Sequence, residues 1–123
     1  MNLELVNIDF LDSGYNFEPK IQANLLCGEF WKWLTINDPD HDTIFEQRKQ
    51  IAFELFNHSE LFTYREFLFF SACNSLMVTV QENPDDNVRL IQLIKCIKEI
   101  LTCKIEDLIN LIEFKPTTFK EEE

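Results

Sequence analysis

Three aspartates at alternate positions, Asp38, Asp40 and Asp42, come nearest to a known chemistry in this chain. An EF-hand loop places calcium ligands at its first, third and fifth positions with this spacing. The rest of the loop does not fit, because Thr43 stands where a glycine is required and Lys49 where a bidentate glutamate is required. We therefore expect no calcium site here and no metal site elsewhere.

The remaining reactive residues also lack the spacing of a catalytic site. The four cysteines form no CxxC motif, neither histidine belongs to a recognisable catalytic motif, and the two isolated glycines cannot form a phosphate-binding loop. We expect a protein that is not an enzyme and has no cofactor, with reduced thiols that are buried as small hydrophobes. These thiols belong to Cys27, Cys73, Cys96 and Cys103.

Charge is the strongest signal in the composition. The chain has 22 Asp and Glu against 11 Lys and Arg, a net charge of −11. The acids are concentrated in residues 1–42, in residues 82–86 and in the last three residues, whereas residues 87–120 carry a small positive excess. Nucleic-acid binding requires clustered Lys and Arg, so this charge argues against a nucleic-acid partner and favours a basic protein partner.

Hydrophobic spacing predicts a single all-α domain over residues 1–123, a bundle of about five helices. One helix runs from Pro19 to a break at 37–40, and the next from 42 or 43 to His58 in its last turn. A capping box at Thr63 and Glu66 starts a third helix, which is apolar on nearly every face and should be the central one. A fourth follows a cap at Asp86, and 105–112 either continues it or follows a kink near 102–104. The expected core on the first, third and fourth helices is Ala23, Leu26, Cys27, Phe30, Leu34, Phe67, Leu68, Cys73, Leu76, Leu90, Ile91, Ile94, Ile97 and Leu101.

Two segments allow more than one interpretation. Residues 3–11 alternate like a strand but have no hairpin partner, so we expect residues 1–17 to form an extended or irregular arm packed on the helices. Residues 76–80 are rich in β-branched side chains and could form a short strand in place of the end of the third helix. The tail 116–123 is expected to be frayed and acidic.

The acidic loops at 38–42 and 82–86 suggest a binding surface. In an up-and-down bundle both connections would emerge at one end and would bring six carboxylates together. We expect this acidic pole to contact the partner, with nearby aromatic side chains as anchors if they are exposed. The predicted contact residues are Asp38, Asp40, Asp42, Glu82, Asp85, Asp86, Tyr15, Trp31 and Trp33.

These features favour a small cytosolic protein that neutralises a basic protein. The first hypothesis is an immunity protein that inhibits a bacterial nuclease-type toxin. The second is a DNA mimic of the anti-restriction or anti-CRISPR type, although the acids cluster in loops and are not spaced like phosphates. The third is a secretion chaperone or scaffold subunit, which would use exposed apolar surface. No uncharged stretch is long enough to span a bilayer, so we expect no membrane partner.

Overall fold

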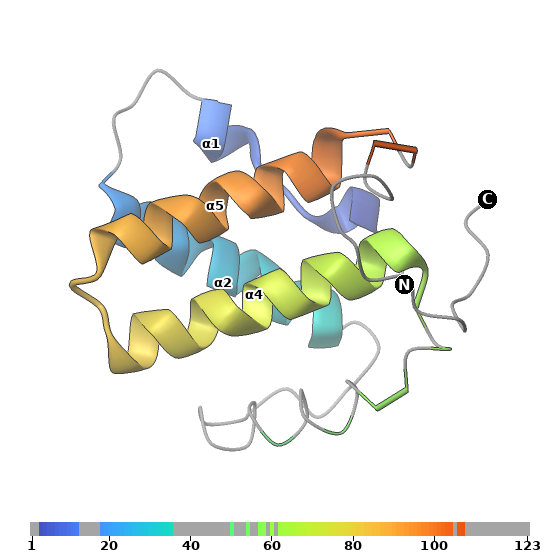
Figure 1. The fold of residues 1–123 in the computed structure, drawn as a ribbon, viewed down its shortest axis with the longest axis horizontal. Coiled ribbons are helices and arrows are strands. Elements are labelled where there is room, and N and C mark those ends of the chain that lie inside the picture. The colour runs from blue at the N-terminus through green and yellow to red at the C-terminus, as the bar shows by residue number, and fades with distance from the viewer. Residues whose placement is uncertain are drawn as a thin grey trace.

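The computed structural model describes residues 3–12, 18–35, 50, 54, 57–58, 60, 62–104 and 106–107. This part of the chain is helical and has no strand (Figure 1), which confirms the all-α class. Its elements are a 3-10 turn at Leu3–Leu5, α1 (Asp9–Asp12), α2 (Pro19–Thr35), α4 (Tyr64–Glu82) and α5 (Asn87–Thr102). Most of the helix expected over 43–58, the continuation beyond 107 and the tail 116–123 lie outside the described residues.

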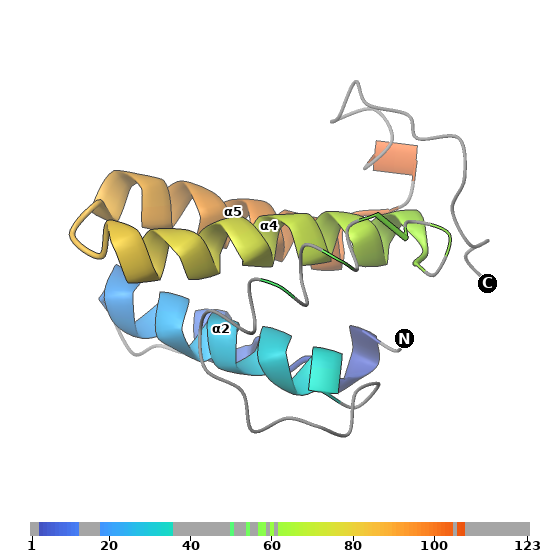
Figure 2. The same cartoon turned by 90° about the horizontal axis from the view of Figure 1, so that it is seen from below.

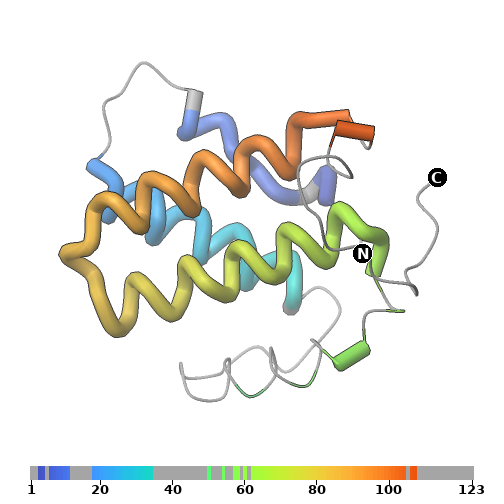
Figure 3. The backbone as a smooth tube through the Cα atoms, viewed as in Figure 1, coloured from blue at the N-terminus to red at the C-terminus, as the bar shows by residue number. Residues whose placement is uncertain are grey.

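The three long helices pack in two layers. α4 and α5 form an antiparallel pair, and α2 lies across both on one side (Figure 2). α2 and α5 run in the same direction, whereas α4 runs in the opposite direction, as the backbone tube also shows (Figure 3).

Helix α4 begins where the sequence predicts. Thr63 accepts a hydrogen bond from the Glu66 backbone N–H at 3.1 Å, and the Glu66 carboxylate accepts one from the Thr63 N–H at 2.8 Å. This reciprocal pair satisfies two donors that a helix start would otherwise leave unbonded. The helix then continues to Glu82, so residues 76–80 are not a strand. Phe67, Leu68, Cys73 and Leu76 are buried, as expected for a central helix.

Helix α5 also begins as predicted, with Asp86 accepting a hydrogen bond from the Arg89 N–H at 3.1 Å. It ends at Thr102, because Cys103 has an extended backbone (φ −73°, ψ 154°) and does not continue the helix. The buried side of α5 differs in part from the prediction. Ile91 is 40% exposed and Leu101 is half-buried, while Leu93 and Ile100 are buried in their place. The buried face is therefore rotated slightly around the helix.

A cluster of aromatic rings lies in the part of the core between α2 and α4. On α2, Phe30 and Trp33 lie against Phe69 and Phe70 of α4, with ring centroids 5.1–6.1 Å apart and edge-to-face angles of 72–82°. Phe62, just before α4, adds further ring contacts at 5.5–6.4 Å. Edge-to-face pairs combine large apolar burial with favourable ring electrostatics, so this cluster holds α2 on α4.

The N-terminal arm packs on this core, as expected, but it is not extended. The Val6 N–H donates to the Leu3 carbonyl at 3.0 Å and the Leu11 N–H to the Ile8 carbonyl at 2.9 Å, so local turns satisfy the backbone. The alternation of apolar residues over 3–11 resembles a strand. Here it arises from short turns, which also direct the apolar side chains towards the core. The side chains that pack against the core are Leu3, Val6, Ile8, Phe10 and Leu11.

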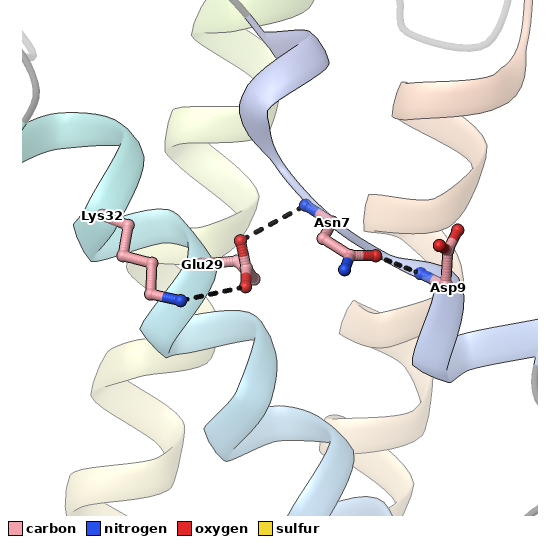
Figure 4. A network of polar contacts seen from close by, with 4 residues as sticks. All are labelled: Asn7, Asp9, Glu29 and Lys32. Atoms are coloured by element: carbon pink, nitrogen blue, oxygen red, sulfur yellow. Dashed lines mark hydrogen bonds and ion pairs between the residues drawn. The ribbon is translucent and has the colours of Figure 1, made fainter.

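One polar contact joins the arm to α2, and a second contact within α2 positions the carboxylate that makes it (Figure 4). Glu29 accepts a hydrogen bond from the Asn7 backbone N–H at 3.2 Å, and its other carboxylate oxygen lies 3.5 Å from Lys32 Nζ. The Asn7 side chain in turn accepts from the Asp9 N–H at 2.9 Å and starts α1.

At the opposite end of the α4–α5 pair from their connection, Arg65 joins the two helices. Its guanidinium donates a hydrogen bond to the Ile100 carbonyl in the last turn of α5. A cation beside the carbonyls of a helix C-terminus is favourable because it offsets their partial negative charge.

Candidate binding surface

The short connection between α4 and α5 is the best-described part of the predicted acidic pole. The Asn83 N–H donates to the Thr79 carbonyl at 2.8 Å and the Asp86 N–H to the Asn83 carbonyl at 3.1 Å, which gives the turn a defined shape. Every residue from Gln81 to Arg89 is exposed. Glu82, Asp85 and Asp86 are therefore accessible to a partner, and their role in contact remains a prediction.

A salt bridge attaches this connection to the first turn of α2. Lys20 Nζ lies 2.5 Å from Asp85 Oδ1. The hydrogen bond to Lys20, followed by its charge, lowers the pKa of Asp85, and the same two causes raise the pKa of Lys20. Both side chains are well exposed, so the pair adds little to stability, and its main effect is to neutralise one carboxylate of the loop.

The net charge at this end of the bundle is therefore small. Its described carboxylates are Glu18 and the three of the loop, and its basic side chains are Lys20 and Arg89. The end is acidic, with an excess of two negative charges.

The expectation that both acidic loops emerge at this end rested on a wrong topology. An up-and-down bundle requires α2 and α4 to run in the same direction, but they are antiparallel (Figure 2). The start of α2, not its end at Thr35, lies beside the 82–86 connection. α2 therefore ends, at Thr35, at the far end of the bundle from this connection. Asp38, Asp40 and Asp42 lie outside the described part of the chain.

The predicted aromatic anchors are placed differently from one another. Trp33 is 1% exposed and belongs to the core, so it is not an accessible contact residue. Its ring packs edge-to-face on Phe69 with centroids 5.1 Å apart. Trp31 is half-buried against the same core, and Tyr15 lies outside the described residues.

Exposed aliphatic side chains at this end were not predicted. In the described part of the chain the exposed large hydrophobic residues are Ile21 and Leu25 on α2 and Val88 and Ile91 on α5. The signal for the first pair was present in the sequence, because both positions lie off the apolar stripe that begins at Ala23. The sequence pattern predicts Ile91 in the core, and its exposure corrects that prediction.

The cysteines are less uniformly buried than expected. Cys73 is buried, Cys27 and Cys103 are half-buried and Cys96 is exposed. Burial, followed by the neighbouring thiols of Cys27 and Cys96, raises the pKa of Cys73 well above its ordinary value, so this thiol is a poor nucleophile. Partial desolvation of the Cys96 thiol, followed by the charge of Glu99, also raises the pKa of Cys96.

Further observations on the described residues concern metal ligands, His58 and membrane-spanning helices. No cluster of three His, Cys, Asp or Glu side chains among the described residues has the geometry to hold a metal ion. His58 Nδ1 contacts Glu60 Oε1 at 3.0 Å on an exposed surface. The helices within the described ranges are too short or too polar for any of them to cross a membrane.

Comparisons with protein-family models, with curated proteins and with solved structures gave no match.

Proposed function

We propose that the protein is an acidic binding protein that neutralises a basic protein partner. Its most specific form is an immunity protein that occupies the basic cleft of a bacterial nuclease-type toxin in the cytoplasm. The observation that carries the proposal is the net charge of −11 on a small helical domain. The exposed carboxylates of the α4–α5 connection add support. A further helix over 43–58 and one from 105 would complete the bundle of about five.

Electrostatics explains why this charge suits a nuclease. A cleft that attracts phosphates carries a positive potential, and an acidic ligand is drawn to it by the same field. Such attraction raises the association rate by tens-fold or more at low salt and falls as salt screens it. Salt bridges at the rim then add little affinity, so the strength of binding must come from apolar contacts.

A second candidate is a secretion chaperone or scaffold subunit. Chaperone surfaces need accessible apolar side chains, and Ile21, Leu25, Val88 and Ile91 supply four of them. The DNA-mimic hypothesis has no comparable support, because the described end has only a small excess of negative charge.

The test begins with capture of the partner from the native host and its identification by mass spectrometry. Association kinetics are then measured from about 50 to 500 mM salt. We expect a basic partner whose association rate falls at least about tenfold over this range. An association rate that is insensitive to salt contradicts the proposal.

Two matched variants locate the contact. Glu82→Gln/Asp85→Asn/Asp86→Asn removes three charges at the α4–α5 connection and retains a good helix cap, because asparagine caps as well as aspartate. Glu99→Gln/Glu106→Gln/Asp107→Asn removes three exposed charges near and beyond the other end of α5. We expect the first variant to associate several-fold more slowly than the second. Equal rates would contradict a role for the 82–86 connection.

A further inference from the structure

The exposed aliphatic residues share one position in the fold. Ile21 and Leu25 lie in the first two turns of α2, and Val88 and Ile91 in the first two turns of α5. Their exposed fractions are 44%, 42%, 68% and 40% in that order. No other large hydrophobic side chain in the described part of the chain reaches this exposure.

The two pairs are brought to the same end by the parallel packing of α2 and α5 (Figures 1 and 2). The contact between Lys20 and Asp85 links the first turn of α2 to the residue just before the α5 cap. Spacings of four residues on α2 and three on α5 place each pair on one side of its helix. Single exposed apolar residues are ordinary, but their restriction to one end indicates a binding surface.

We propose that this end of the bundle, formed by Ile21, Leu25, Val88, Ile91 and the carboxylates beside them, docks a basic amphipathic helix of the partner. The aliphatic side chains would receive the apolar face of that helix, whose side chains recur every three or four residues. Glu18, Glu82 and Asp86 would face Lys and Arg on its flanks. A second copy of this chain is a poor occupant, because two molecules of net charge −11 repel one another.

This inference rests on the proposed function and adds an apolar docking site to it. The experiment uses three synthetic helical peptides of about 18 residues, long enough to cross both helices. The first has a leucine face and lysine flanks. The second keeps the lysines but replaces the leucines by glutamine, and the third keeps the leucines but replaces the lysines by glutamate. Binding to the whole protein is measured by fluorescence anisotropy.

The expected result is binding of the leucine–lysine peptide, with the other two at least about tenfold weaker. Leu25→Ser/Ile91→Ser should weaken that binding at least about tenfold. Asn24→Ser/Gln92→Ser, at neighbouring exposed positions of the same helices, should leave it unchanged. Circular dichroism checks that both variants fold. In methyl NMR of the wild type, addition of the leucine–lysine peptide should change the chemical shifts of the four aliphatic residues.

Several results overturn the inference. If both lysine peptides bind equally and the serine variant binds as the wild type does, electrostatic recognition stands and the apolar site fails. Equal binding of the glutamate peptide removes the charge argument. Binding of neither lysine peptide counts against both the inference and the proposed function. Sedimentation that finds a dimer dissociated by Leu25→Ser/Ile91→Ser would assign the surface to a second copy.

Discussion

Phe69 is the side chain on which the packing of α2 against α4 depends most directly. It is fully buried and lies edge-to-face on both Phe30 and Trp33. Phe69→Ala should lower the free energy of unfolding by roughly 3–5 kcal/mol, because a large cavity replaces these contacts. Urea denaturation measures the change, and Phe69→Leu should cost clearly less. A loss below about 1 kcal/mol would show that the ring cluster does not hold the helices together.

Thiol reactivity should distinguish the cysteines by their exposure. Cys96 should react first with a disulfide reagent in the native protein, although its raised pKa makes the reaction slow at neutral pH. Cys73 should react only after unfolding, because it is buried and its pKa is raised well above its usual range. Ellman titration with and without denaturant measures both rates.

Cys96→Ala provides the control, since it should remove the first native phase. Reaction of Cys73 at the same rate as Cys96 would contradict the placement of this thiol in the core.

At the scale of helices, the cap of α4 should have a measurable effect on stability. Thr63→Ala removes the hydroxyl that accepts from the Glu66 N–H and should cost about 1 kcal/mol. Thr102→Ala is the matched control: its exposed hydroxyl donates to the Lys98 carbonyl, and we expect a change within about 0.5 kcal/mol. Equal losses in chemical denaturation would show that the cap is not the cause.

The link between α2 and the α4–α5 connection should depend on pH. The pKa of Asp85 is lowered in the folded protein, so its contribution to stability is present above the ordinary carboxyl value of about 4. That contribution is lost as the pH falls through the lowered pKa. Asp85→Asn should therefore lower the Tm slightly at neutral pH and have no effect in acid. In a Lys20→Met background, Asp85→Asn should no longer have a pH-dependent effect on the Tm. If the effect persists there, the salt bridge between Lys20 and Asp85 is not its cause.

The beginnings of helices were the most predictable features of this fold. The cap at Thr63 and the cap at Asp86 involve residues three apart, so the local sequence contains all the information. The direction of α2 relative to α4 was not predictable in this way. It depends on ring contacts such as Trp33 with Phe69, which join residues distant in sequence.

In the candidate site, too, some features follow from the local sequence and others only from contacts between distant residues. The exposure of the 82–86 connection follows from its charge, whereas its proximity to Ile21 and Leu25 follows only from the parallel arrangement of α2 and α5. The inward side of α5 was predicted incompletely because apolar residues occupy both sides of its first turns. Only contact with the neighbouring helices selects Leu93 over Ile91.

For the whole molecule, the charge of −11 should weaken the fold through self-repulsion. Raising the salt concentration from about 20 to 200 mM should increase the Tm, because screening reduces this repulsion. Thermal unfolding at neutral pH measures the effect. The Tm of Asp85→Asn should rise with salt at least as much as that of the wild type, because this variant lacks the ion pair with Lys20 that salt weakens. A Tm that falls with salt would show that surface ion pairs outweigh the repulsion.

The hydrogen bond from Arg65 to the Ile100 carbonyl joins the first turn of α4 to the last turn of α5. Helix ends normally fray independently, each with its own small free energy of opening. Here the final turn of α5 cannot unwind without releasing the guanidinium, so the two ends share one cooperative opening. Slow amide exchange should therefore reach the first turn of α4 and the last turn of α5 together.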